Sequence, residues 1–166
     1  MTVPAYSAIR RESTFDVSYA AFTTAFEALL GRMDVAAFAD LAKLGPDAAR
    51  AKLASVVGPL DFTLFQTLDH GGILTALAAK PTRAMTYVFG NALIAVEMTK
   101  HDPRAGLYVP LRLFVQEIAP QRVLVTYDLP SATMAQLESR AIDDVARSLD
   151  DKVERLLAAT IERARS

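Results

Sequence analysis

The clearest hydrophobic pattern in the chain is one long stripe near its C-terminal end. The apolar residues that form it recur at steps of three and four: Ile142, Val145, Ala146, Leu149, Val153, Leu156, Leu157 and Ile161. On a helix of 3.6 residues per turn these positions share one face. We therefore predict a long helix after Pro130 whose stripe lies across a sheet, with a coiled coil as the alternative.

Two runs rich in β-branched and aromatic residues precede this helix, at Pro110–Ile118 and Arg122–Asp128. Only three residues separate them, which is typical of an antiparallel hairpin. Alternation along the first run places Arg112 on the same face as Phe114. On the second run, Tyr127 is a candidate for that face as well.

Three earlier segments have the composition or alternation of strands: Tyr6–Ser13, Asp61–Leu68 and Arg83–Phe89. The middle segment alternates most regularly, so one of its sides is expected to be buried. That side carries Phe62, Leu64 and Leu68, and the opposite side carries Asp61, Thr63 and Thr67.

Helical segments fill the spaces between these strands. The first begins at a cap, Asp16 or Ser18, and its apolar stripe continues to Met33. Two shorter helices follow within residues 34–58, where Gly45-Pro46 ends one and starts the next. We interpret residues 34–58 as a helical insertion on the flank of the domain. Two further short helices are predicted, at Ile73–Ala79 and around Leu93–Met98.

The order of these elements predicts one α+β domain over residues 1–166. Its antiparallel sheet packs against the long C-terminal helix, and the N-terminal half adds extra helices.

Composition excludes several classes of protein. With 52% hydrophobic and 22% charged residues, the chain is expected to fold rather than to be disordered. Lys and Arg number 18 against 19 Asp and Glu, without a central basic stripe, so nucleic acid is not an expected partner. The absence of cysteine excludes disulfides, thiol nucleophiles and zinc–thiolate or iron–sulfur sites.

The chain is also expected to be a soluble cytoplasmic protein that does not enter a membrane. Its N-terminal segment lacks the apolar region of a secretory signal. Its most apolar stretch, around Leu93–Val96, is far shorter than the roughly 20 residues of a membrane helix.

No nucleotide-binding, nucleophile-elbow or zinc-protease motif occurs in the sequence. The two histidines each neighbour an aspartate, in Asp69-His70 and His101-Asp102. They are thirty-one residues apart, so a shared metal site is less favoured than a role in turns. We expect neither a metal nor a cofactor, and we interpret Ser131 as a helix cap rather than a nucleophile.

The densest group of polar and aromatic residues supplies the candidate ligand site. It contains His101, Arg104, Tyr108 and Arg112, and its candidate neighbours are Tyr87, Tyr127 and His70. An arginine and phenols in one cleft would suit an anionic or amphipathic molecule. The alternative is that Arg112 is a structural strut paired with Asp102 or Asp128.

These segments also carry a family resemblance. The residues that carry it are Tyr87-Val88-Phe89-Gly90-Asn91, Met98-Thr99-Lys100-His101-Asp102, Leu107-Tyr108-Val109-Pro110-Leu111-Arg112 and Tyr127-Asp128-Leu129-Pro130-Ser131. Together they resemble the family called domain of unknown function 302, most strongly over residues 69–131. One departure is Ala92, where the family often has proline.

The resemblance implies a fold like that of the TATA-binding protein, with a curved sheet crossed by a C-terminal helix. It also implies homodimers, but no reaction, substrate or cofactor. Fold-level likeness alone does not assign a function.

Three functions remain open from the sequence. The first is a homodimeric domain that binds a small amphipathic or anionic molecule. The second is an enzyme in which His101 or His70 acts as acid or base beside Arg104 or Arg112. The third is an interaction domain without a ligand. An apolar pocket without histidine would favour the first, and a pocket holding both a histidine and an arginine would favour the second.

Overall fold

The structure is a computed structural model that describes the backbone of residues 5–166 and their side chains apart from Val35. Residues 1–4, the start of the segment considered above for a secretory signal, lie outside it. The strands are β1 (Arg10–Phe15), β2 (Gly31–Arg32), β3 (Thr63–Asp69), β4 (Ala84–Gly90), β5 (Leu111–Ala119) and β6 (Arg122–Asp128). The helices are α1 (Tyr19–Ala28), α2 (Phe38–Leu41), α3 (Pro46–Ser55), α4 (His70–Ala78), α5 (Ala92–Thr99), α6 (Pro130–Met134) and α7 (Arg140–Ala164). Short 3₁₀ turns lie at η1 (Val35–Ala37), η2 (Pro103–Leu107) and η3 (Ala135–Leu137).

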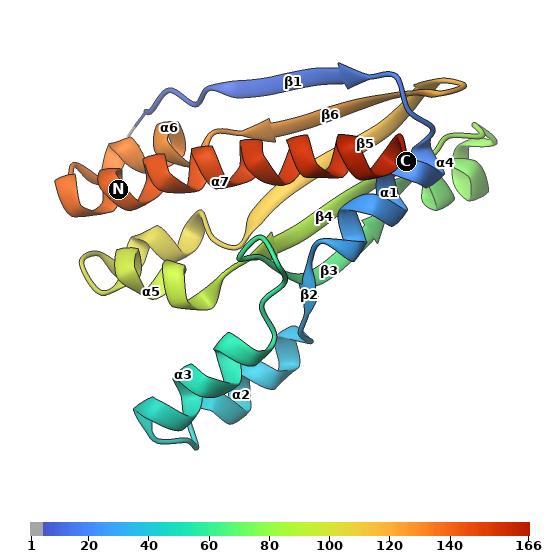
Figure 1. Cartoon of the computed structure of the whole chain (residues 1–166). Coiled ribbons are helices and arrows are strands. Elements are labelled where there is room, and N and C mark those ends of the chain that lie inside the picture. The colour runs from blue at the N-terminus through green and yellow to red at the C-terminus, as the bar shows by residue number, and fades with distance from the viewer. Residues whose placement is uncertain (1–4) are drawn as a thin grey trace.

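The strands form one sheet in the order β1-β6-β5-β4-β3-β2. All neighbouring pairs are antiparallel except β2 and β3, which run parallel. The predicted α+β class is therefore confirmed, with the difference that the sheet is mixed. The predicted hairpin is β5 and β6, at the centre of the sheet. Figure 1 shows α7 crossing the sheet on the side that also carries α1 and α5.

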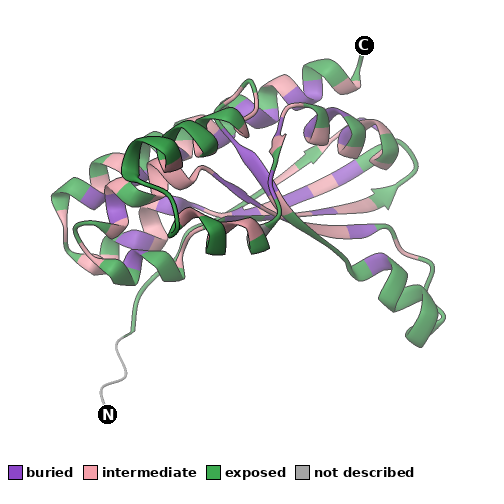
Figure 2. Ribbon diagram, turned by 90° about the horizontal axis from the view of Figure 1, so that it is seen from below, coloured by how far each residue is buried: buried purple, intermediate pink, exposed green. Residues whose placement is uncertain are grey.

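The hydrophobic core lies between the sheet and α7, as the stripe predicted. Leu156 and Ile142 of α7 are fully buried, as are Leu113 and Val115 of β5. Buried residues accordingly follow the strands and the inner sides of the helices in Figure 2. Burying such side chains is the main favourable contribution to folding.

The face of the sheet that points away from α7 is called the open face here. Arg112 on this face is exposed, and Phe114 is half-buried, in agreement with the predicted alternation of β5. The prediction that Tyr127 shares this face is wrong. The register pairs Phe114 with Thr126, so Tyr127 points to the opposite side, where it is 8% exposed. The hairpin register fixes the face of every residue on the second strand.

A bulge overturns part of the predicted pattern in β3. Leu64 pairs with Phe89 but Gln66 pairs with Val88, which leaves Phe65 as the extra residue. Such a bulge inverts the alternation that follows it. As a result Leu68 is 40% exposed, contrary to its predicted side. Thr63, which precedes the bulge, is also buried contrary to prediction, and its hydroxyl donates to the Val56 carbonyl at 3.0 Å.

The first helix is shorter than its apolar stripe suggested. Ser18 caps it as predicted, but it ends at Ala28, and Gly31–Arg32 becomes a strand instead. The amide of Gly31 donates to the Phe62 carbonyl at 2.9 Å. A Cβ at Gly31 would lie 1.8 Å from the Val56 carbonyl oxygen, so only glycine permits this approach.

The first strand and the long C-terminal helix also begin at other residues than predicted. The first strand begins at Arg10 rather than Tyr6. The segment after Pro130 is not one helix, because Glu138 adopts a left-handed conformation with φ 52° and separates η3 from α7. The long helix therefore starts at Arg140.

The remaining helices lie at the margins of the sheet. Figure 1 shows α2 and α3 below the sheet and α4 at the end of the β3–β4 connection. Gly45 and Pro46 begin α3 as predicted. Within residues 5–166, the longest apolar helical segment falls short of what a membrane crossing requires.

Candidate functional site

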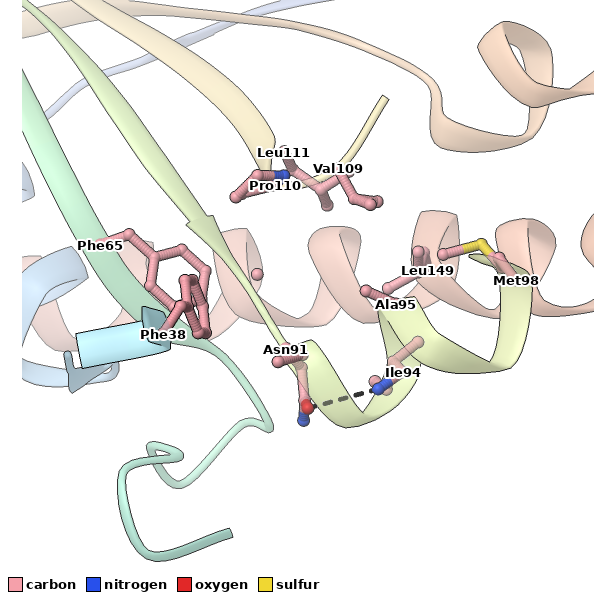
Figure 3. Close-up of a pocket in the computed structure, with 12 residues that line it drawn as sticks. Phe38, Phe65, Asn91, Ile94, Ala95, Met98, Val109, Pro110, Leu111 and Leu149 are labelled. Carbon is pink, nitrogen blue, oxygen red and sulfur yellow. Dashed lines mark hydrogen bonds between the residues drawn. The ribbon is translucent and has the colours of Figure 1, made fainter. Parts of the chain in front are cut away.

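A partly open apolar cavity lies where β4 passes into α5, and we call it the α5 cavity. It has a volume of about 180 Å³. Its lining residues are Phe38, Phe65, Gly90, Asn91, Ala92, Ile94, Ala95, Met98, Val109, Pro110, Leu111 and Leu149. They come from α2, β3, β4, α5, β5 and its preceding loop, and α7. Figure 3 shows two phenylalanine rings at one end of the cavity and the α5 side chains at the other.

The aromatic end of the cavity depends on the β3 bulge. Phe65, the extra residue of the bulge, packs against Phe38 with ring centroids 5.4 Å apart. Bulges of this kind redirect a side chain away from the regular alternation of a strand. The bulge thus places Phe65 in the cavity wall rather than on the open face.

Small residues leave the space between the two ends. Gly90, Ala92 and Ala95 line the cavity and have the smallest side chains of the set. A Cβ added at Gly90 would meet Phe65 and Pro110 at 3.6 Å, which is ordinary van der Waals contact. Gly90 is therefore a position where the cavity could be reduced without a clash.

Among the described lining residues, Asn91 alone carries a polar side chain, and that side chain is already bonded. Its Oδ1 accepts from the amides of Leu93 at 2.9 Å and Ile94 at 3.4 Å, so it caps α5. Its Nδ2 donates to the Asp61 carbonyl at 3.0 Å. The capping amide therefore has little capacity left for a ligand.

Two of the sequence-predicted site residues meet elsewhere, at the start of β5. Tyr108 and Arg112 line a separate hollow of about 290 Å³. Tyr108 also lines an adjoining hollow of about 900 Å³, together with Arg104. Arg104 is exposed and held by Asp102, with Nη2 and Oδ2 at 2.7 Å. That bond lowers the pKa of Asp102 below its ordinary value.

Tyr87 and Tyr127 lie on the α7 side of the sheet, apart from this group. Tyr87 is fully buried and donates to Glu27 Oε1 at 3.1 Å. Burial and then the Glu27 carboxylate raise the pKa of Tyr87 above its ordinary range. Burial also raises the pKa of Tyr127, and the Glu154 carboxylate adds to that effect.

The two histidines do not share a site. His70 begins α4, and its Nε2 lies 3.1 Å from Thr86 Oγ1 on the open face. His101 is exposed just after α5. Within the part of the chain that the structure describes, no three His, Cys, Asp or Glu side chains gather as metal ligands would.

The prediction that Ser131 caps a helix is wrong, because Leu129 is the N-cap residue of α6 and Ser131 lies within its first turn. The amide of Ser131 donates to Asp150 Oδ1 at 3.0 Å, and its hydroxyl donates to Asp150 Oδ2. This pair ties the start of α6 to the middle of α7 and gives Ser131 a role in holding the two helices together.

Comparison with known families identifies the kind of domain. The sequence model of the family described as domain of unknown function DUF302 matches residues 38–160. The chain belongs to the DUF302 family. All lining residues of the α5 cavity fall inside the matched stretch of this DUF302 domain. No curated protein matches the chain in sequence.

A solved structure agrees with the fold of the DUF302 domain. The chain is similar to the crystal structure of an uncharacterized conserved DUF302 protein from Bacillus stearothermophilus, with a TM-score of 0.61 and 11% sequence identity. The similarity covers 93% of this chain and 97% of that protein. At this identity it supports the fold alone.

Sequence reasoning missed the α5 cavity as a site. Its walls are apolar residues of ordinary core types, and they span the chain from Phe38 to Leu149. The closest available signal was the group of small residues after β4, opposite an aromatic run in β3. Alternation alone would have placed Phe65 elsewhere.

Proposed function

We propose that this DUF302 domain is a binding module for a small, neutral, mostly apolar molecule held in the α5 cavity. The observation that carries the proposal is the lining itself. Eleven of the twelve lining residues have no side-chain nitrogen or oxygen. The twelfth is Asn91, whose side-chain amide is already bonded: its Oδ1 caps α5 and its Nδ2 donates to the Asp61 carbonyl. Ligand pockets are typically concave and apolar, and a charged ligand would lose its hydration here without a compensating partner.

The size of the cavity limits the ligand. An engineered apolar cavity of about 150 Å³ in another protein binds benzene or xenon. The α5 cavity, at about 180 Å³, is of the same order. It therefore suits a molecule of one small ring or a short aliphatic chain.

The same lining favours a binding module over an acid–base enzyme. General acid–base catalysis needs a titratable group within hydrogen-bond reach of the reacting atoms. Among the described residues, neither a histidine nor a carboxylate lines the α5 cavity. The histidines proposed for catalysis lie on other parts of the surface.

Titration of the full chain with toluene, followed by amide NMR, tests the proposal. We expect saturable shifts concentrated at residues 90–98 and at Phe65. Ala95→Leu would fill the cavity from α5, so it should weaken toluene binding by about tenfold or more. Ala158→Leu is the matched control, because it adds the same side chain at an exposed position of α7; its binding should equal that of the wild type.

Two results would count against the proposal. One is the absence of saturable shifts at these positions. The other is equal binding by wild type and a folded Ala95→Leu variant, which would locate the toluene elsewhere.

We further propose that the domain acts as a homodimer. Large exposed apolar side chains gather at one end of the sheet: Leu68, Ile73, Leu74, Leu77 and Ile118. In Figure 2 the mostly exposed α4, which contributes three of them, stands apart from the other helices. Exposed apolar groups of this kind are typical of protein–protein contacts and support a second copy as partner.

A further inference from the structure

The hollow at the start of β5 has a chemistry that differs from that of the α5 cavity. Its walls include Tyr6, Tyr108, Pro130 and the side chains of Arg112 and Asp128. The two tyrosine rings meet edge to face with centroids 6.4 Å apart. We call this space the Arg112 hollow. It lies on the open-face side, and its volume of about 290 Å³ is near the lower limit for small-molecule pockets.

The charge of Arg112 has no partner among the described residues, unlike that of every other arginine on a strand. The other four strand arginines each have a carboxylate within salt-bridge distance: Arg10 with Asp128, Arg11 with Glu154, Arg32 with Glu27 and Arg122 with Asp16. No carboxylate of residues 5–166 lies within salt-bridge distance of the Arg112 guanidinium, although Asp128 lines the same hollow.

The acids that could have paired with Arg112 are already occupied. Asp128 accepts two bonds from Arg10, at 2.9 and 3.3 Å. Asp102 accepts from the guanidinium and the amide of Arg104. The strut interpretation of Arg112 therefore loses both of its candidate partners, and Arg112 lines a hollow whose other walls include aromatic and proline side chains.

This combination fits one class of ligand. A guanidinium presents two parallel N–H donors that match the two oxygens of a carboxylate. Phenol rings and prolines offer flat apolar surface that an aromatic ring can contact. Because Arg10 neutralises Asp128, the acid in the wall opposes a bound anion only weakly.

We propose that the Arg112 hollow binds a small aromatic carboxylate, with its carboxylate on Arg112 and its ring against Tyr108. This site goes beyond the function proposed above. It does not depend on the α5 cavity, with which it shares only the wall residues Pro110 and Leu111.

Benzoate and its neutral analogue benzamide are the probes, titrated into the full chain at constant ionic strength and followed by amide NMR. We expect benzoate to shift the amides of residues 108, 109, 111, 112 and 128, and benzamide to bind at least about tenfold more weakly because it lacks the charge that Arg112 would contact.

Arg112→Gln should weaken benzoate binding by about tenfold or more. Arg112→Lys should weaken it by a smaller factor, about threefold to tenfold, because lysine keeps the charge without the planar pair of donors. Arg122→Gln is the matched control, since it removes another strand arginine outside the hollow, and it should leave binding unchanged.

Arg112 is exposed, so we expect the melting temperatures of both Arg112 variants to stay close to that of the wild type. This result would identify Arg112 as a ligand anchor, since replacing a structural strut would lower the melting temperature. The proposal is overturned if benzoate and benzamide bind equally, or if Arg112→Gln and Arg112→Lys both bind benzoate like the wild type. Shifts confined to residues outside the hollow would overturn it as well.

Discussion

At the scale of single residues, the buried phenol of Tyr87 shows how a polar group is accommodated in this core. Its hydroxyl donates to Glu27, whose other oxygen accepts from Arg32 at 2.7 Å. The hydroxyl is thereby linked to the surface through a charged partner. A buried hydroxyl without such a partner would reduce stability.

Tyr87→Phe removes this bond and leaves the packing of the ring nearly unchanged. Since hydrogen bonds to charged groups contribute about 1.5–3 kcal/mol, we expect the free energy of unfolding to fall by about that amount. Denaturant titration measures the change. Tyr6→Phe serves as the control, because Tyr6 is 51% exposed, and it should change stability by less than about 0.5 kcal/mol.

The raised pKa of Tyr87 predicts how stability depends on alkaline pH. The unfolded chain ionises this tyrosine near pH 10, before the folded chain does. The contribution of the neutral phenol is therefore fully present below about pH 10 and is lost as the pH rises further. We expect the melting temperature of the wild type to fall more steeply between about pH 10 and 12 than that of Tyr87→Phe. Equal slopes would show that Tyr87 does not titrate differently in the two states.

Residue-level predictions from the sequence succeeded where a simple alternation holds. Arg112 and Phe114 share a face because β5 is regular at that point. Tyr127 could not be placed, because its face depends on the register of the hairpin. The partners of Tyr87 could not be found either, since Glu27 lies sixty residues earlier in the chain.

At the scale of elements, periodicity identified the long helix and the hairpin but not the irregularities that shape the site. The α7 stripe is buried as predicted because an apolar face of this length must be covered. The β3 bulge and the β2 strand have no local signal. Both depend on contacts between distant backbones, such as that of Gly31 with Val56.

The α7 stripe can be tested by a cavity-forming substitution. Leu156 is fully buried, so Leu156→Ala should lower the free energy of unfolding by about 2–5 kcal/mol. Leu107→Ala in η2 is the matched control, because Leu107 is 80% exposed, and its effect should stay below about 0.5 kcal/mol. A loss at Leu156 as small as that at Leu107 would mean that α7 does not bury this face.

At the scale of the whole molecule, the α5 cavity forms only when distant segments assemble. Phe38 and Leu149 both line it, although more than one hundred residues separate them in the chain. A cavity of this kind cannot be read from sequence, because each wall residue also suits an ordinary core. The family resemblance supplied the fold but no site.

The homodimer is a second expectation at this scale. Analytical ultracentrifugation at micromolar concentration should give a species of twice the 18.0 kDa chain mass. Leu77→Asp together with Ile73→Asp should shift that species toward the monomer, because charges would be buried in an apolar contact. A wild type that sediments as a monomer would contradict the homodimer. A dimer that the double variant leaves intact would instead place the contact on another surface.

The most direct measurement of the central claim is a crystal structure of the protein after exposure to xenon gas. Xenon enters preformed apolar cavities and makes no hydrogen bonds, so it reports the property on which the proposed function depends. We expect a xenon atom between Phe65, Ala95 and Pro110 in the wild type, and a lower occupancy in Gly90→Ala, whose added methyl group reduces the space. A wild-type cavity that contains ordered water, or that takes up no xenon, would contradict the account.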